Sequence, residues 1–121
     1  MLRYIELKSG FHDDGPAWIG RVVESKSGRT LYFDGKALKR LKKPGERTNY
    51  VDVATTEQYW IAPVKKRGSN RYQASAAPIT VEAAAVAELL ALLGAESLDP
   101  GRFQVSAAIR PAAIRPAADR R

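Results

Sequence analysis

The sequence has no cysteine, one histidine and one methionine. It also has no apolar run near the ~20 residues that a membrane-spanning helix needs. The absence of cysteine excludes disulfides, thiolate metal sites and cysteine nucleophiles, and it is typical of a protein from a reducing compartment. The first residues carry no hydrophobic segment of a secretory signal. We therefore expect a cytoplasmic protein that does not bind membranes.

The chain is 121 residues long and 45% hydrophobic, which suits one small domain with a modest core. A multidomain cofactor enzyme does not fit in this length, so we expect no cofactor. Residues 1–106 are predicted to form a single basic β-rich domain. Residues 107–121 carry Ala-Ile-Arg-Pro-Ala twice in succession. Because a proline every five residues breaks a helix, this tail is predicted to be disordered.

Alternation of apolar and polar residues predicts strands rather than helices over the first two thirds of the chain. Gly28 is expected to supply a positive φ in the first hairpin, and Asp34-Gly35 is a strong turn dipeptide. Residues 36–43 fit either a short helical turn or a strand. The predicted strands cover 2–8, 17–24, 30–33, 50–53, 58–61, 64–66, 71–73 and 102–105, with brief pairing at 79 and 81.

One helix is predicted at about 82–93, because Val86, Leu89, Leu90 and Leu93 form one apolar stripe. Gly94 stands where a left-handed C-cap residue belongs. The pattern predicts an α+β fold: a small, strongly bent antiparallel β-sheet or SH3-like barrel with one C-terminal amphipathic helix.

The net charge of +7 is uneven, because 15 of the 20 Lys and Arg residues lie in residues 1–73. A first basic cluster comprises Lys36, Lys39, Arg40, Lys42, Lys43 and Arg47. A second basic cluster comprises Lys65, Lys66, Arg67 and Arg71. Such clusters attract polyanions, although lysine-rich turns also serve simply as solvated surface.

Nine of the ten aromatic residues share the basic part of the chain. Small β-barrels bind single-stranded nucleic acid by stacking bases on aromatic rings while Lys and Arg contact phosphates. Tyr59 and Trp60 are neighbours on a strand, so their side chains face opposite ways. If one of them is exposed beside the second basic cluster, it is the stacking platform. Alternatively, the core covers one ring and the helix covers the other.

Several segments carry a resemblance to a known family, among them Gly-Pro-Ala-Trp-Ile-Gly-Arg-Val at 15–22 and Ser-Lys-Ser-Gly-Arg-Thr-Leu-Tyr-Phe at 25–33. The other segments are 2–8, 35–39, 50–53, 59–61, 64–66 and the 82–92 helix. Over about residues 2–105 the chain resembles a family of short uncharacterised bacterial proteins that are often labelled 1-deoxy-D-xylulose-5-phosphate synthase. The resemblance implies almost nothing about function.

That label does not suit this chain, which lacks the length and the Gly-Asp-Gly motif for holding thiamine diphosphate and Mg²⁺. The chain also departs from the family pattern at two places. Arg47-Thr48-Asn49 stands where members carry Gly and Ser, and Tyr72-Gln73 stands where members carry His-Trp. No role of that His-Trp pair transfers to this chain.

The sequence contains no motif that indicates a catalytic site. His12 is followed by Asp13 and Asp14 in a glycine-flanked loop, a pattern more typical of Asx turns than of a base or a metal site. Gly35-Lys36 lacks the Ser/Thr and the upstream glycine of a phosphate-binding loop. We expect no enzyme and no metal site.

The leading prediction is a non-enzymatic module that binds nucleic acid, single-stranded rather than duplex. The predicted contacts are Lys36, Lys39, Arg40, Lys42, Lys43, Lys65, Lys66, Arg67, Arg71, Tyr59 and Trp60. The alternative is a protein–protein interaction module that uses the helix or a sheet edge. A weaker third hypothesis is a hydrolase that uses His12 and Asp14.

Overall fold

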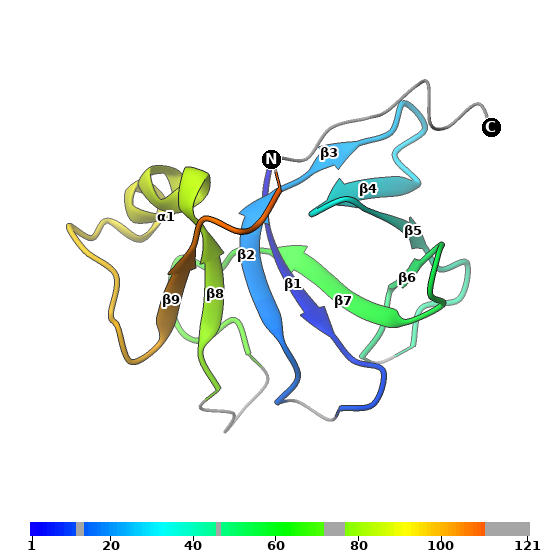
Figure 1. The fold of residues 1–121 in the computed structure, drawn as a ribbon, viewed down its shortest axis with the longest axis horizontal. Helices are drawn as coiled ribbons and strands as arrows, with labels where there is room; N and C mark the ends of the chain where they lie inside the picture. The colour runs from blue at the N-terminus through cyan, green and yellow to red at the C-terminus, as the bar shows by residue number, and fades with distance from the viewer. Residues whose placement is uncertain (12–13, 46, 72–76, 111–121) are drawn as a thin grey trace.

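A computed structural model describes residues 1–11, 14–45, 47–71 and 77–110. Figure 1 shows a curled sheet with one short helix beside it. The elements in chain order are β1 (Leu2–Leu7), β2 (Ala17–Arg21), β3 (Val23–Glu24), β4 (Thr30–Phe33), β5 (Lys36–Arg40), β6 (Tyr50–Asp52), β7 (Gln58–Pro63), β8 (Ile79–Glu82), a 3₁₀ turn (Ala83–Ala85), α1 (Val86–Leu93) and β9 (Phe103–Ser106).

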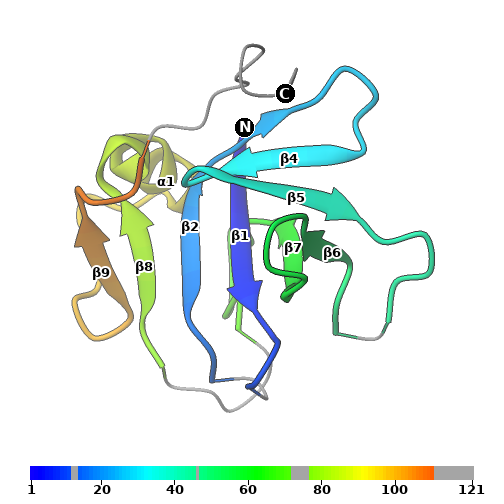
Figure 2. The same ribbon diagram turned by 45° about the vertical axis from the view of Figure 1, so that its right-hand side comes forward.

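The strands form one mixed sheet in the order β3-β4-β5-β6-β7-β1-β2-β8-β9. Only Val22 separates β2 from β3, yet β2 pairs with β1 and β3 pairs with β4. Because one continuous segment joins distant places in the strand order, the sheet curls back on itself. Figures 1 and 2 show this half-barrel from two directions. The prediction of a strongly bent, β-rich α+β fold is therefore confirmed at this level.

The predicted antiparallel sheet is only partly correct. All pairs from β3 to β2 are antiparallel, but β8 pairs in parallel with both β2 and β9. Parallel neighbours that follow each other in the chain need a crossover connection, which is usually helical. The 3₁₀ turn and α1 lie in the connection between β8 and β9. The single helix thus explains why the end of the sheet is parallel.

The curled sheet separates two hydrophobic clusters, which we call the inner core and the helix-side core. Side chains alternate along β1, so Ile5 faces the inner core while Tyr4 faces the helix-side core. The inner core lies within the curl and comprises Ile5, Val22, Leu31, Phe33, Leu38, Tyr50, Tyr59 and Ile61. The helix-side core comprises Leu2, Tyr4, Ala17, Ile19, Ile79, Val81, Ala85, Leu89 and Phe103.

The helix begins later than its apolar pattern predicts. Glu82 ends β8 instead of opening the helix, and its buried carboxylate accepts a hydrogen bond from the Arg21 backbone N–H at 2.8 Å. Leu89 is fully buried, and Val86, Leu92 and Leu93 pack against the helix-side core. Gly94 has φ 65° at the C-cap, as predicted.

The ambiguous segment after Asp34-Gly35 is a strand. Phe33 pairs with Lys36, so Asp34 and Gly35 are the two central residues of the hairpin turn. Their φ values of 47° and 73° are those that a type I′ turn requires. By contrast, the hairpin predicted at 64–66 and 71–73 has no strand in the described residues 64–71, and 72–73 lie outside them.

Gly20 lies where three parts of the sheet approach one another. A Cβ atom placed on it would lie 2.5 Å from the Phe33 ring and 2.9 Å from Glu82 Oε1. Phe33 belongs to the inner core, and Glu82 is buried at the end of β8. Only a residue without a side chain fits at this point of β2.

Residues 107–110 differ from the predicted disordered tail. Ile109 packs against the inner core, and Arg110 contacts Asp34 at the turn between β4 and β5. The rest of the predicted tail, 111–121, lies outside the described residues.

Candidate functional site

The two basic clusters lie on different parts of the molecule. The first basic cluster lies on β5 and on the loop between β5 and β6. Lys65, Lys66 and Arg67 of the second basic cluster come after the end of β7. Gly68, next to them, accepts a hydrogen bond of 3.5 Å from Arg102, which directly precedes β9. Figures 1 and 2 place the β5–β6 loop and β9 at opposite sides of the sheet. The expected positive surface shared by both clusters is therefore not formed.

Within the second basic cluster, Lys65, Lys66 and Arg67 are exposed but Arg71 is not. Arg71 is only 4% exposed, and its Nη2 donates a hydrogen bond of 3.0 Å to the Pro78 carbonyl. Its Nη1 lies 4.0 Å from Glu6 Oε2, on a carboxylate that also accepts a bond of 2.7 Å from Lys8 Nζ. The prediction that Arg71 contacts a phosphate is wrong, because its guanidinium is buried.

The aromatic pair of β7 is divided between the two cores. Tyr59 is 2% exposed within the inner core, and burial raises its pKa to about 12. Trp60 faces the other way and packs, half-buried, against the helix-side core. The prediction that one ring of the pair is buried is confirmed. Tyr59 is thus excluded as a stacking platform, and much of Trp60 is already covered.

The first basic cluster remains open to solvent. Lys39, Arg40, Lys42, Lys43 and Arg47 are exposed, whereas Lys36 is half-buried with its Nζ 3.6 Å from Asp34 Oδ2. Lys39 and Arg40 are neighbours on β5, so their side chains face opposite sides of the sheet. The loop that follows β5 adds the other exposed cations. This is the part of the predicted interface that the structure keeps accessible.

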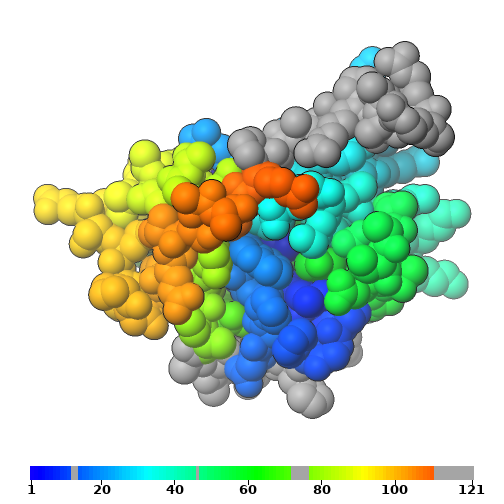
Figure 3. Space-filling view, in the orientation of Figure 1, coloured from blue at the N-terminus to red at the C-terminus, as the bar shows by residue number. Residues whose placement is uncertain are grey.

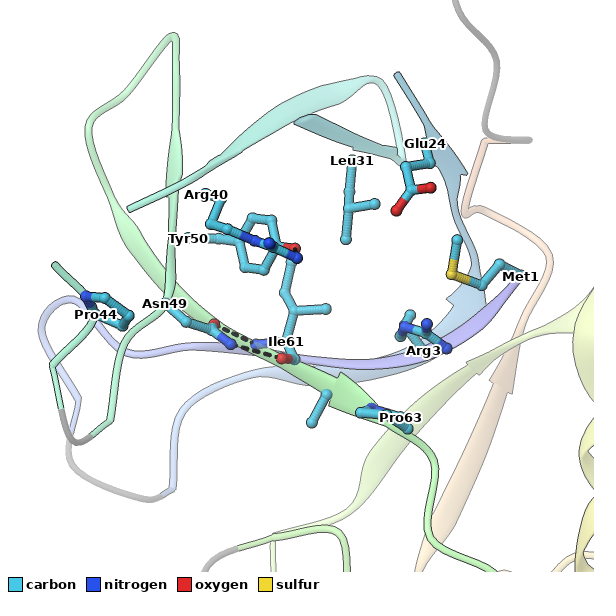
Figure 4. A pocket seen from close by; sticks show the side chains of 11 residues that line it. Met1, Arg3, Glu24, Leu31, Arg40, Pro44, Asn49, Tyr50, Ile61 and Pro63 are labelled. Carbon is cyan, nitrogen blue, oxygen red and sulfur yellow. Dashed lines mark hydrogen bonds between the residues drawn. The ribbon is translucent and has the colours of Figure 1, made fainter. Parts of the chain in front are cut away.

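A pocket of about 410 Å³ adjoins this cluster (Figure 4). Arg40 and Pro44 both line it, so Lys42 and Lys43 belong to the loop that borders it. The volume lies within the ~300–1,000 Å³ that is common for small-ligand sites. The lining residues are Met1, Arg3, Glu24, Leu31, Arg40, Pro44, Asn49, Tyr50, Ile61, Ala62 and Pro63.

Arg40 is held against an aromatic wall of the pocket. Its guanidinium carbon lies 5.9 Å from the centre of the Tyr50 ring, and Nη2 lies 3.5 Å from the Tyr50 hydroxyl. The hydrogen bond to Tyr50 and its Coulombic interaction with that ring raise the pKa of Arg40. Arg40 is therefore a fixed positive charge with a flat, solvent-accessible guanidinium.

The Tyr50 wall is fixed to β7 by the preceding residue. The Asn49 side-chain amide donates to the Ile61 carbonyl and its Oδ1 accepts from the Ile61 N–H, both at 2.8 Å. Figure 4 shows this pair of bonds at the floor of the pocket. Asn49 thus replaces a strand partner and holds the β5–β6 loop beside the opening.

The charges around the opening are mixed but mainly positive. Arg3 enters from β1 and donates a hydrogen bond of 2.9 Å from Nη1 to the Leu2 carbonyl. Figure 4 shows Arg3 and Arg40 on opposite sides of the pocket, with Glu24 also at its edge. Sequence reasoning missed Arg3, Asn49 and the pocket itself, because these residues converge only when the sheet curls.

Other kinds of site find little support in the described ranges. Those residues contain no group of three or more His, Asp or Glu side chains that could hold a metal ion. His12, on which the hydrolase hypothesis depends, lies outside them. No helix in the described part of the chain is long and apolar enough to cross a membrane. Comparisons of the chain with protein families, curated proteins and solved structures found no match.

Proposed function

We propose that this protein is a non-enzymatic binding module for single-stranded nucleic acid. Its binding surface comprises the exposed part of the first basic cluster and the adjoining pocket. The observation that carries the proposal is the position of Arg40, which belongs both to the basic cluster and to the pocket wall. Phosphates would lie along Lys42, Lys43 and Arg47 of the loop that borders the pocket, whereas Lys39 faces the other side of β5.

An unpaired base is the group that suits the pocket. Arginine guanidinium planes stack on nucleobases, and unstacked bases of single strands are available for such contacts. The Arg40 guanidinium lies over the Tyr50 ring and lines the pocket, so a base in the pocket could stack on it. Arg3, across the pocket, is in position to contact a neighbouring phosphate. A duplex would have to unpair to fill this pocket, so we propose a preference for single strands.

The curled sheet supports this surface through its bend at Val22. We propose that β2 and β3 act as one bent strand that closes the curl in the manner of an SH3-like barrel. The support is that the segment bonds to β1 through β2 and to β4 through β3. The pocket residues then sit around one open end of the curl.

Two triple variants test the proposal because each removes three exposed cations. Lys42→Gln, Lys43→Gln and Arg47→Gln change the proposed interface. Lys65→Gln, Lys66→Gln and Arg67→Gln are the matched control on the second basic cluster. Each lost phosphate contact lowers affinity about fivefold at 0.1 M salt, from a salt exponent of about 0.7 per contact on single strands.

We expect the interface triple to weaken binding of a labelled oligonucleotide about 100-fold at 0.1 M salt, and the control triple to weaken it at most a few-fold. Fluorescence anisotropy over a salt series measures both effects. Equal losses in the two triples would indicate non-specific attraction and contradict the proposed surface. Absence of binding by the unaltered protein at low salt would reject the function.

A second candidate function is docking of a partner protein along β9. The observation that favours it is Val105, which is 56% exposed on the last strand of the order within the described residues. An open strand edge is a template for pairing with another chain. The predicted alternative through the helix is weaker, because the apolar stripe of α1 already packs against the helix-side core.

A further inference from the structure

The turn between β4 and β5 holds the segment that follows β9. The Arg110 backbone N–H donates to Asp34 Oδ1 at 2.9 Å, and Arg110 Nη2 donates to the Asp34 carbonyl at 3.0 Å. Arg110 Nε lies 3.6 Å from the same carboxylate. Figure 3 shows the segment after β9, in orange, reaching the cyan strands of the half-barrel. One residue of the turn thus binds both the backbone and the side chain of Arg110.

Gly35, whose φ is 73°, leaves room for the Arg110 guanidinium in this contact. A Cβ atom on Gly35 would lie 2.5 Å from the guanidinium carbon of Arg110. The guanidinium therefore lies directly over the glycine backbone. Next to it, Ile109 packs against the inner core. The site combines a carboxylate, a flat backbone surface and an apolar contact, which together select an Ile-Arg pair.

The sequence contains this pair twice. Residues 108–112 and 113–117 are both Ala-Ile-Arg-Pro-Ala, with no difference between the copies. The contacts described above use only the isoleucine, the arginine side chain and the arginine backbone N–H. The second copy supplies the same groups in the same order, so the turn has no chemical means of telling the copies apart.

We propose that the Asp34-Gly35 turn is a recognition site for the Ile-Arg motif. We further propose that the second copy, 113–117, occupies the site in place of the first within the same chain. Three residues lead from Ser106, the end of β9, to Ile109, and eight lead to Ile114. Because the entropy of loop closure varies with about the 3/2 power of length, the first copy is favoured only about fourfold. The two copies therefore share the site.

The backbone amide resonance of Gly35 in an ¹H–¹⁵N NMR spectrum of the full chain reports occupancy of the site. We expect Arg115→Ala to leave the Gly35 signal at its original position. Arg110→Ala should move it only slightly, because Arg115 replaces Arg110. Arg110→Ala with Arg115→Ala empties the site and should move the signal furthest. In the Asp34→Asn background, which keeps a residue that tolerates positive φ but removes the carboxylate, the same pair of substitutions should move the signal much less.

Arg110→Ala combined with Arg120→Ala is the matched control, since Arg120 lies outside both copies. We expect it to behave like Arg110→Ala alone. If Arg110→Ala alone shifts Gly35 as far as the double motif variant, the second copy does not dock. If the double motif variant leaves Gly35 unmoved, the turn is not a recognition site. If the Gly35 position in Arg110→Ala depends on protein concentration, docking occurs between molecules and the proposal for one chain is wrong.

Discussion

Similar basic residues are exposed on one side of the curled sheet and buried on the other. At the open end of the curl, Arg40, Lys42 and Lys43 remain exposed on or next to the wall of a pocket. On the helix side, Lys8 and Arg71 are drawn inward to the buried carboxylate of Glu6. Basic residues thus form an exposed surface on one side of the sheet and part of a buried polar cluster on the other. Burial, rather than charge density, decides which cations can meet a ligand.

The largest expected effect is on the helix side. Replacing Arg71 by Met removes its bond to the Pro78 carbonyl and its proximity to Glu6. Glu6 keeps its hydrogen bond from Lys8, so its charge stays paired. The lost hydrogen bond from the charged guanidinium and the lost attraction to Glu6 should together destabilise by about 3 kcal/mol. Urea denaturation measures the change. Lys66→Met, at an exposed position of the same basic cluster, is the control and should stay within about 0.5 kcal/mol. Similar small losses in both variants would show that Arg71 is not buried in solution.

The next largest expected effect is a loss of folding stability at alkaline pH, which arises from Tyr59 in the inner core. Burial raises the pKa of Tyr59 to about 12, above the ordinary tyrosine value of about 10. Because the unfolded state loses this proton first, the stability contributed by neutral Tyr59 is complete below pH 10 and is lost as pH rises towards 12. The loss amounts to roughly 2–3 kcal/mol.

Tyr59→Phe has no proton to lose and should remove that part of the pH dependence. Denaturation at pH 8 and at pH 11.5 compares the two proteins, and the unaltered protein should lose about 2 kcal/mol more between these two pH values than Tyr59→Phe does. An identical decline in both proteins would contradict the assignment of the decline to Tyr59. Because Phe keeps the ring, this substitution leaves the apolar packing of the inner core in place.

The smallest effect concerns the loop that carries the exposed cations. Asn49→Ala removes both hydrogen bonds to the Ile61 backbone and should destabilise by about 1–2 kcal/mol. Asn49→Asp keeps the acceptor but places a carboxylate oxygen against the Ile61 carbonyl oxygen, so its loss should be at least as large as that of Asn49→Ala. Hydrogen exchange of the Ile61 amide provides a local measurement. Unchanged exchange in Asn49→Ala would mean that the side chain does not hold the loop.

Much of the strand pattern was predictable because one face of most strands is buried. Alternation locates β1, β4, β6 and β7 to within two residues at each end. Predicted residues 17–24 are one segment whose bend at Val22 divides it into β2 and β3. The bend is invisible in the pattern, because no proline or turn dipeptide marks Val22. The parallel pairing of β8 was missed for a related reason, since alternation does not specify the direction of a neighbour.

The candidate site was predictable only in its exposed cations. Lys39, Arg40, Lys42 and Lys43 stand in a local run, which a sequence displays directly. Arg71 also stood in such a run, but its partner Glu6 is 65 positions away and nothing local predicts the pairing. Arg3 and Asn49 carry no motif, and only the curl of the sheet brings them to the pocket.

Because Gly20 has no side chain, the two cores approach each other closely there, and their packing is coupled. A larger residue there would press on Phe33 in one direction and on Glu82 in the other, so neither core could relax without displacing its neighbour. At Gly20 the sheet is the boundary shared by the two cores, and it has no room for a side chain. A substitution at Gly20 must therefore be accommodated by both cores at once, whereas exposed positions of the rim and the loops are less constrained.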